Sequence, residues 1–392
     1  MTEFTTITTT DALAAFCEQA KAQPYVTIDT EFLRERTFYS RLCLIQMALP
    51  PASGAKTDGG PAVLVDPLTF GLSLEPLYDL FRHESTVKVF HAARQDLEIF
   101  FHDAGVFPTP LFDTQIAAMV CGFGEQVGYE TLVRRIAKGN LDKSSRFTDW
   151  SQRPLSKAQQ DYAIADVTHL RAIYEHLRAD LDKTGRSPWV AEEVAVLVDP
   201  ETYISRPEDA WQRVRTRTNS PRFLAVVRKL AEFREEYAQN KNVPRSRVFK
   251  DDALVELAST RPQTEAELGR SRLLLREGRK PEIAQGILAA VKAGLDDPDP
   301  PRVPKEQHNP PGNAALGELL RVLLKAKAEE TGVAPKLIAT TSELDAIAQG
   351  NRDVPALHGW RAKVFGLDAL RLAGGEIALS AEGGAIRVVD LT

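Results

Sequence analysis

The chain has few cysteines and no long apolar run, and both absences narrow the kinds of protein it can be. Its 392 residues include three cysteines, Cys17, Cys43 and Cys121, which stand far apart. Isolated cysteines favour neither a disulfide framework nor a zinc site built from paired thiolates. The sequence has no apolar stretch of about 18 residues, and its N-terminus lacks the charged-then-apolar pattern of a secretion signal. We therefore expect a cytoplasmic protein that does not enter a membrane.

An excess of positive charge is also lacking. The formal net charge is −5, from 49 Lys and Arg against 54 Asp and Glu, whereas proteins that bind nucleic acid are commonly basic. The hydrophobic content of 43% is ample for packed cores and argues against disorder. The length predicts two or three domains. If the chain binds nucleic acid, binding must rely on local basic patches.

Acidic residues in three short segments carry the clearest chemical signal. Asp29 and Glu31 fall in YVTIDTEF, whose β-forming residues predict a strand, and alternation places both carboxylates on one face. Asp96 falls in VFHAARQDLEIF, where an apolar strand end leads into a helix. Tyr162 and Asp166 stand four residues apart in QQDYAIADVTHL, on one side of a predicted helix.

This set of residues predicts a metal site. Carboxylates at a strand centre and on inward helix faces are costly to bury unpaired, so we expect a cation to neutralise them. Oxygen ligands from separate elements suit Mg²⁺ or Mn²⁺. Two such ions about 3.5–4 Å apart form a clamp for in-line displacement at phosphorus, one beside the attacking water and one beside the leaving 3′-oxygen. With an unperturbed pKa of about 10, Tyr162 is a poor base, and we predict that it orients the water.

The same segments resemble a known family. DTE in a strand, HAARQD opening a helix and YAIAD are similar to the three exonuclease motifs of the DEDD superfamily, in its tyrosine-bearing branch. IDTEFLRERTFYSRLCLIQMA, FHAARQDLEIFF, LFDTQIAAMVCGFG and TDWSQRPLSKAQQDYAIADVTHL resemble ribonuclease D over roughly the first half of the chain.

The resemblance implies a ribonuclease-H-like α/β domain, a mixed sheet flanked by helices, that removes 5′-mononucleotides from RNA 3′ ends. It implies two Mg²⁺ or Mn²⁺ ions held chiefly by Asp29, Glu31 and Asp166, with Asp96 helping at the second ion. It also implies RNA substrates such as tRNA precursors, and we expect a monomer.

Four neighbouring residues each have two interpretations. Phe32 could stack on a terminal base, as aromatics do on single strands, or pack in the core. His91 could touch substrate or be a structural histidine. Arg153 could meet a phosphate or form a surface salt bridge. Asp113 in FDTQIAA is interpreted chiefly as a helix N-cap.

Pro- and Gly-rich stretches and changes in composition divide the chain into four parts. We predict an exonuclease domain over 1–205, with strands near 25–31, 41–49 and 62–66. A helical block over 214–294 follows, then a stiff linker over 295–313 with six prolines within 296–313. A second helical block over 314–392 ends in a hairpin around Glu382, Gly383 and Gly384. We expect the helical blocks to fold separately from the first domain.

The two helical blocks look related to each other. NVPRSRVFKDDALVELA at 242–258 aligns with GVAPKLIATTSELDAIA at 332–348, at an offset of 90 residues. Both resemble the HRDC domain, a small all-α bundle found in ribonuclease D and in some helicases, and the second copy is the more divergent.

Positive charge gathers in one segment of the first block. Residues 213–250 hold eleven Lys or Arg and three Glu, a net charge of +8. Phe223, Val226, Val227, Leu230 and Phe233 fall at helical spacing, so an amphipathic helix with a solvated basic face accounts for the segment structurally. Contact between that face and phosphates is the functional interpretation.

Three classes of function remain on this basis. The leading one is a metal-dependent 3′–5′ exoribonuclease, with tRNA precursors as substrates. A DNA 3′–5′ exonuclease acting in repair is the alternative, because the same carboxylates serve both chemistries and discrimination rests on contacts to the 2′-hydroxyl. A non-catalytic nucleic-acid-binding module is disfavoured because all five motif residues are present.

Overall fold

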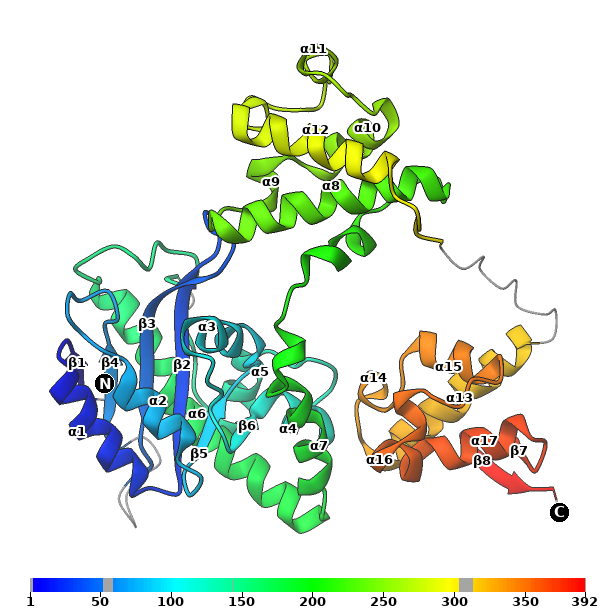
Figure 1. Ribbon diagram of the computed structural model, residues 1–392. Coiled ribbons are helices and arrows are strands. Elements are labelled where there is room, and N and C mark those ends of the chain that lie inside the picture. The colour runs from blue at the N-terminus through cyan, green and yellow to red at the C-terminus, as the bar shows by residue number, and fades with distance from the viewer. Residues whose placement is uncertain (1–2, 52–58, 143, 303–312, 392) are drawn as a thin grey trace. The chain divides into compact units, whose positions relative to one another are not determined.

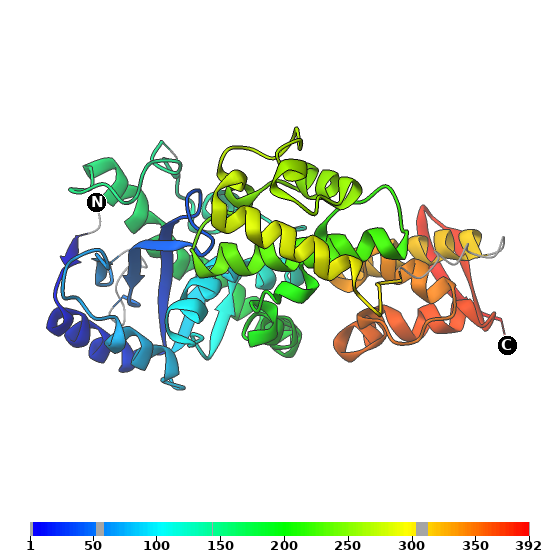
Figure 2. The same ribbon diagram turned by 45° about the horizontal axis from the view of Figure 1, so that its top comes forward.

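The computed structural model describes residues 3–51, 59–142, 144–302 and 313–391 (Figures 1 and 2). The chain divides into two compact units. The first comprises Met1–Glu31, Cys43–Thr202 and His308–Thr392, and the second comprises Phe32–Leu42 and Tyr203–Gln307. Neither unit is therefore one continuous stretch of chain. Most of the predicted linker, residues 303–312, lies outside the described residues.

A six-stranded mixed sheet forms the centre of the first unit. Its strands are β1 (Phe4–Ile7), β2 (Tyr25–Leu33), β3 (Arg41–Ala48), β4 (Ala62–Val65), β5 (Val87–Phe90) and β6 (Leu111–Asp113). Their order in the sheet is β1-β4-β3-β2-β5-β6. β1 runs parallel to β4, β4 runs antiparallel to β3, and β5 runs parallel to both β2 and β6. The predicted mixed sheet is confirmed.

Helices surround this sheet (Figure 1). They are α1 (Thr10–Lys21), α2 (Glu75–Arg82), α3 (Arg94–Ala104), α4 (Thr114–Val120), α5 (Tyr129–Leu132), the π-helix η1 (Val133–Ala137), α6 (Lys157–Thr184) and α7 (Ser187–Leu197). The long helix α6 packs against β4 and β5. It begins with a capping box, in which Ser156 and Gln159 exchange hydrogen bonds with each other's backbone.

A buried threonine joins the strand and the helix that carry the acidic motifs. β2 lies inside the sheet between β3 and β5. The Thr27 hydroxyl on β2 contacts the carbonyl oxygens of Ala48 (3.1 Å) on β3 and Val167 (2.8 Å) on α6. Because Val167 follows Asp166, these contacts fix the distance between the two acidic motifs.

Asp113 does more than the predicted N-cap. It caps α4 by accepting hydrogen bonds from the backbone N–H groups of Gln115 (2.8 Å) and Ile116 (3.3 Å). Its carboxylate also accepts from the N–H groups of Ala92 (3.1 Å) and Ala93 (2.8 Å). Ala92 has a φ of 57°, which is unfavourable for a residue with a Cβ. Asp113 therefore holds the strained turn that leads into α3.

The second unit contains the first helical block. Its elements are η3 (Pro207–Arg213), α8 (Pro221–Asn240), α9 (Arg245–Val248), α10 (Asp251–Thr260), α11 (Glu265–Leu268), η4 (Glu277–Arg279) and α12 (Pro281–Leu295). Both views show α8 and α12 side by side (Figures 1 and 2). They approach closely because Gly294 has no Cβ, which would lie 2.6 Å from the Cα of Val226. The five predicted apolar positions of α8 all pack in this core.

Residues 32–42 belong to the second unit although they connect β2 with β3. The side-chain oxygen of Asn242 accepts hydrogen bonds from the backbone N–H groups of Phe38 and Tyr39, both at 3.0 Å. The Arg245 guanidinium lies 4.4 Å from the centre of the Phe38 ring. The segment that follows the acidic strand is thus held by the first helical block.

The second helical block repeats the helix order of the first. Its elements are α13 (Asn313–Thr331), α14 (Pro335–Ile338), α15 (Thr341–Ala348), η5 (Pro355–Leu357), α16 (Gly359–Arg361), η6 (Ala362–Gly366) and α17 (Leu367–Ala373). The starts of α14 and α15 lie at the predicted offset of 90 residues from those of α9 and α10. Strands β7 (Ile377–Glu382) and β8 (Ala385–Asp390) form the predicted terminal hairpin. In the described part of the chain, no helix has the length and apolar character needed to cross a membrane.

The second block packs on helices of the exonuclease domain and shares one compact unit with it. The rings of Trp189 on α7 and Trp360 on α16 stack with centroids 4.8 Å apart. Glu193 accepts hydrogen bonds from the indole N–H of Trp360 (2.8 Å) and from Arg361 (2.6 Å). The backbone N–H of Ala334 donates to Met119 (3.1 Å). No local pattern in the sequence predicts this packing. A truncation after about residue 205 would expose Trp189 to solvent.

Replacing Asp113 by Ala should lower the free energy of unfolding by about 2–4 kcal/mol, because one cap and two further buried hydrogen bonds are lost. The matched control is Thr9→Ala, since Thr9 caps α1 through one hydrogen bond of 3.3 Å, and this change should cost about 1 kcal/mol or less. Denaturant unfolding followed by circular dichroism measures both. Equal losses would contradict the additional role of Asp113.

Candidate active site

Three predicted carboxylates meet at one point. Asp29 and Glu31 lie on β2 and Asp166 lies on α6, and one carboxylate oxygen from each lies within 4.8 Å of the others. Alternation along β2 places Asp29 and Glu31 on the same side, as the sequence predicted. The Thr27 contact to α6 brings Asp166 to them. This is the spacing expected of ligands that share a metal ion.

Asp96 lies beside this cluster, in the first turn of α3, and is 6% exposed. The Thr30 hydroxyl donates a hydrogen bond to the Asp96 carboxylate. Sequence reasoning missed Thr30, because alternation placed it on the opposite face of β2 from the paired carboxylates. Its position between Asp29 and Glu31 was the only available signal. Thr30 orients Asp96 rather than adding a ligand.

The acidic groups repel one another in a place with little water. Burial, followed by the charges of Asp166, Asp96 and Glu31, raises the pKa of Asp29 well above its usual value. Burial, followed by Asp166 and Asp96, raises the pKa of Glu31 to about 9. Burial raises the pKa of Asp96 to about 7. All three shifts point the same way, because the site disfavours negative charge when no cation is bound.

Two tyrosines border Asp166. The Tyr162 hydroxyl, one turn earlier on α6, hydrogen-bonds the Asp166 carboxylate, and burial followed by the charge of Asp166 raises the Tyr162 pKa above its usual value. The Tyr129 hydroxyl donates to the backbone carbonyl oxygen of Asp166 (2.6 Å). Tyr162 is therefore protonated at neutral pH and able to donate, which fits the predicted orienting role. Sequence reasoning missed Tyr129.

A cavity of about 510 Å³ adjoins the carboxylates. Asp29, Tyr162 and Asp166 line it, together with His91 and Arg146. Arg146 was missed because it lies in SSRFTDW, outside the motifs; its charge lowers the pKa of Glu31, against the larger effect of burial. Arg146 therefore brings positive charge to the cavity.

The structure places the three predicted substrate contacts differently. His91 lines the cavity, where its Nδ1 lies 3.0 Å from the Thr114 hydroxyl. Arg153 forms a bidentate ion pair with Asp66 (2.6 and 2.7 Å) and donates to the Cys43 carbonyl oxygen (2.7 Å), which favours its structural interpretation. Phe32 is half-buried, and its stacking on a base stays a prediction.

The donor set fits a divalent cation. Carboxylate oxygens are hard ligands, and three of them converge from two elements, the half-buried Asp29 and Glu31 and the buried Asp166. Burial, followed by the neighbouring carboxylates, raises the pKa values of Asp29 and Glu31, so the site disfavours negative charge without a cation. Bound cations would remove that repulsion and return the carboxyls to their charged forms. Arg146 alone is a partial compensation, since the Glu31 pKa remains at about 9 beside it.

Family models match two parts of the chain. A 3′–5′ exonuclease model matches residues 4–182, and an HRDC domain model matches residues 223–291. The first match covers the sheet and every motif residue, and the second covers most of the first helical block. Together with the carboxylate cluster, they define a metal-dependent 3′–5′ exonuclease.

Similar proteins identify the family of exonucleases to which the chain belongs. A ribonuclease D from Jannaschia sp. (strain CCS1) is 61% identical over 388 residues, covering 98% of this chain and 99% of that protein. A ribonuclease D from Nitrobacter hamburgensis is 48% identical over 387 residues, covering 98% of this chain and 99% of its own. The crystal structure of Escherichia coli RNase D, an exoribonuclease involved in structured RNA processing, matches with a TM-score of 0.81 at 29% identity, over 95% of this chain and 99% of that one.

The chain belongs to the ribonuclease D family. It is a 3′–5′ exoribonuclease, which confirms the predicted activity over the non-catalytic module and favours RNA over DNA as its substrate. The catalytic core of RRP6 from Trypanosoma brucei, with a TM-score of 0.59 at 21% identity over 76% of this chain and 80% of that one, shares the fold.

In the metal-free protein, the contribution of Asp29, Glu31 and Asp96 to the free energy of unfolding should be most favourable under acidic conditions. Their folded-state pKa values are raised, so the folded protein binds protons more tightly than the unfolded one. Their contribution is then lost as pH rises from the unfolded values of about 4 through about 7 for Asp96 and about 9 for Glu31. At pH 8, saturating Mg²⁺ or Mn²⁺ should raise Tm by about 5 °C, and by less at pH 5.

Differential scanning calorimetry with and without the ion measures this increment. Asp29→Asn should abolish most of it, whereas Asp79→Asn, which changes an exposed carboxylate on α2, should keep it. An equal increment in Asp29→Asn would contradict the assignment of the site.

Proposed function

We propose that the protein shortens tRNA precursors and similar structured RNAs at their 3′ ends, releasing 5′-mononucleotides with two divalent ions bound at the carboxylates. The observation that carries this proposal is the convergence of Asp29, Glu31 and Asp166 within 4.8 Å. Mg²⁺ and Mn²⁺ are the ions suited to these oxygen ligands. Asp96, oriented by Thr30, would complete the second position.

When bound, the ions supply positive charge beside the phosphodiester and lower the pKa of water. The side chains of the protein do the remaining work. Asp29, Glu31 and Asp166 would hold the ions, and Asp29 and Asp166 also line the cavity. The protonated Tyr162 hydroxyl orients the attacking water from the Asp166 side, since its raised pKa makes it a poor base at neutral pH.

The cavity beside the carboxylates would accept the terminal nucleotide. Arg146 is placed to offset the charge of the departing phosphate, because it lines the cavity and already acts on Glu31. Burial lowers the pKa of His91, so its neutral ring would contact the nucleotide without adding charge. Phe32 remains our candidate for stacking on a terminal base.

Digestion of matched oligonucleotides tests this function. RNA and DNA of one sequence, labelled at the 5′ or the 3′ end, are incubated with Mg²⁺ or with EDTA, beside a tRNA precursor that carries extra 3′ nucleotides. Stepwise shortening of 5′-labelled RNA, with release of mononucleotides and loss of activity in EDTA, is expected. Equal shortening of DNA, or an unchanged tRNA precursor, would contradict the proposed substrates.

Asp29→Asn and Asp166→Asn should each abolish turnover while keeping the fold and most of the RNA affinity. Each change removes a charge at nearly constant volume, so metal binding suffers and packing does not. Loss of one ligand should cost several kcal/mol of transition-state stabilisation. Single-turnover assays and RNA binding in EDTA measure the two effects. Trimming by purified Asp29→Asn at nearly the wild-type rate would refute the site.

Tyr162→Phe should act differently, lowering kcat by about 10²–10⁴ with little change in metal affinity, because only the orienting hydroxyl is lost. Activity is measured across a metal titration, with Tyr78→Phe as the matched control, since Tyr78 is a buried tyrosine on α2. A shift in the metal midpoint that exceeds the loss in rate would mean that Tyr162 has another role.

A further inference from the structure

Both helical blocks have the same backbone turn between their first two helices. The turn lies between α8 and α9 in the first block and between α13 and α14 in the second. At the offset of 90 residues, Asn242 (φ 46°) corresponds to Gly332 (φ 73°). Pro244 (φ −57°, ψ 140°) corresponds to Ala334 (φ −58°, ψ 125°). The backbone of the turn is therefore repeated, although its side chains differ.

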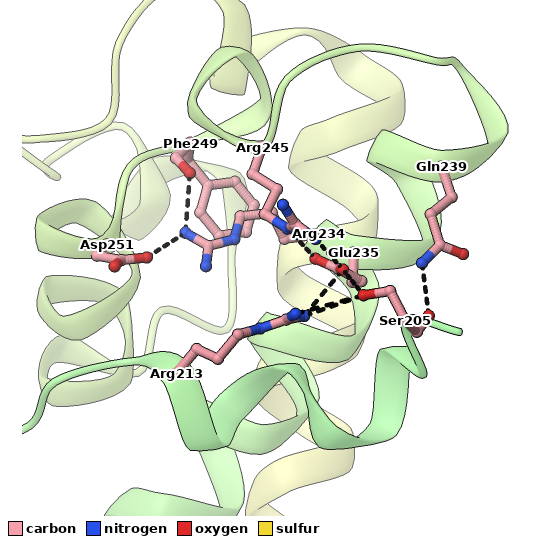
Figure 3. Close-up of polar contacts among 8 residues, drawn as sticks. All are labelled: Ser205, Arg213, Arg234, Glu235, Gln239, Arg245, Phe249 and Asp251. Atoms are coloured by element: carbon pink, nitrogen blue, oxygen red, sulfur yellow. Dashed lines mark hydrogen bonds and ion pairs between the residues drawn. The ribbon is translucent and has the colours of Figure 1, made fainter. Parts of the chain in front are cut away.

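In the first block, the polar contacts around this turn stay within the second compact unit (Figure 3). Arg245, the residue after the turn, donates to Glu235 on α8 (2.5 Å), and Glu235 also accepts from the Ser205 hydroxyl (2.8 Å). Asn242 in the turn holds the segment 32–42 through its side-chain oxygen. The first copy of the turn thus holds chain that belongs to its own unit.

In the second block, the turn contacts the exonuclease domain instead. The backbone N–H of Ala334 donates to the carbonyl oxygen of Met119 (3.1 Å), near the end of α4. Gly122 follows α4 and lies so close to Gly332 that a Cβ added to Gly122 would be 2.9 Å from the Gly332 carbonyl oxygen. Leu337 on α14 packs in the apolar cluster that α4 forms with α6 and α7. The second copy of the turn therefore holds the C-terminal end of α4.

The N-terminal end of α4 belongs to the active-site cavity. The helix has seven residues, so it is a rod of about 10 Å. Thr114 at its start donates to the Phe90 carbonyl oxygen (3.0 Å), and its hydroxyl lies 3.0 Å from Nδ1 of His91. His91 and Gln115 line the cavity. A shift at the C-terminal end of so short a helix therefore also shifts this wall of the cavity.

The segment that follows α4 leads to Asp166. The Gln115 side chain donates to the Val127 carbonyl oxygen (3.4 Å), which ties this segment to the start of α4. Tyr129, two residues later, lines the cavity and donates to the backbone carbonyl oxygen of Asp166 (2.6 Å). Contacts thus run from the second block, through α4 and Tyr129, to one of the three converging carboxylates.

Attachment of the second block to the exonuclease domain does not by itself require the turn. The stack of Trp189 on Trp360 and the hydrogen bonds to Glu193 already join the block to α7. The turn adds a second attachment, at a helix that lines the cavity. This placement points to a role in the reaction as well as in stability.

We propose that residues 332–334 are a positioning element of the active site, which fixes α4 and, through Tyr129, the backbone of Asp166. The second block then acts on the rate of each cleavage rather than on the binding of RNA. The proposal rests on the proposed function, because Asp166 acts there as a metal ligand.

A proline at position 334 tests this role. Ala334→Pro removes the N–H that donates to Met119, and its backbone angles suit proline, as Pro244 in the first block shows. Thr341→Pro is the matched control, because Thr341 is the exposed first residue of α15, where a helix does not need the N–H. The full-length proteins are assayed with Mg²⁺ on a short single-stranded RNA and on a tRNA precursor. Affinity for the precursor is measured in EDTA, and Tm is measured for each protein.

Ala334→Pro should lower kcat about tenfold on both substrates, because displacement of α4 moves the cavity wall away from the reacting groups. Affinity for the precursor in EDTA should be unchanged, and Tm should fall no further than in Thr341→Pro. An unchanged kcat, or an equal loss of kcat in Thr341→Pro, would overturn the proposal. A loss confined to the KM of the precursor would also overturn it, since the second block would then contact RNA.

A second pair of variants decides if Ala334→Pro does not fold. Gly122 and Gly124 both have a positive φ, of 83° and 102°, so alanine strains the backbone at either position. A Cβ at position 122 would meet the second block, whereas a Cβ at position 124 would have no atom within 4 Å. Gly122→Ala should therefore lower kcat about tenfold relative to Gly124→Ala. Equal values of kcat would overturn the proposal.

The outcome is separable from that of the proposed function. If Asp29→Asn abolishes turnover while Ala334→Pro keeps the wild-type kcat, the positioning role alone is removed. If Asp29→Asn keeps the wild-type rate, the assignment of the metal site fails. The kcat of Ala334→Pro then still reports whether the turn acts on the reaction.

Discussion

Repulsion among buried carboxylates is the constraint on which the rest of the first unit depends. Burial, followed by the charges of Asp166 and Asp96, raises the pKa values of Asp29 and Glu31, and burial raises that of Asp96. A structure free to relax would move them apart. The sheet and α6 prevent this because the Thr27 hydroxyl contacts both β3 and α6. The close approach of these carboxylates costs local stability. In return, the ligands of a divalent ion are already assembled, as pre-organised sites require.

The acidic strand also connects the two compact units. β2 carries Asp29 and Glu31 and then continues into residues 32–42, which pack with the first helical block. Asn242 holds the backbone of Phe38 and Tyr39 there. The first helical block therefore holds the chain a few residues beyond Asp29 and Glu31.

The chemistry of the site could be predicted from the sequence because it depends on local spacing. Alternation paired Asp29 with Glu31, and one helical turn paired Tyr162 with Asp166. Thr30 and Tyr129 could not be found in this way, because their roles depend on contacts between elements far apart in the chain. Their residue types are ordinary in a strand and a helix.

The features of the fold that could be predicted also depend on local sequence patterns. The strand segments, the repeat at an offset of 90 residues and the terminal hairpin each follow from local patterns. The stacking of Trp189 on Trp360 does not, because nothing near either residue indicates its partner. The first helical block lies in the second compact unit, whereas the second block packs on α7, and separate folding of the blocks stays a prediction. The boundaries of the four predicted parts stay predictions, since the compact units divide the chain differently.

An acidic protein that degrades a polyanion has to keep opposite charges in separate places. The carboxylate cluster repels phosphate until cations occupy it, whereas the segment 213–250 attracts phosphate at all times through its charge of +8. Phosphate contacts at the basic segment would release counterions and would therefore weaken with salt. Binding at the cluster depends on the divalent ion, because the ion reverses the sign of the local charge. The two charged regions thus respond to different conditions, salt for the basic segment and the divalent ion for the carboxylate cluster.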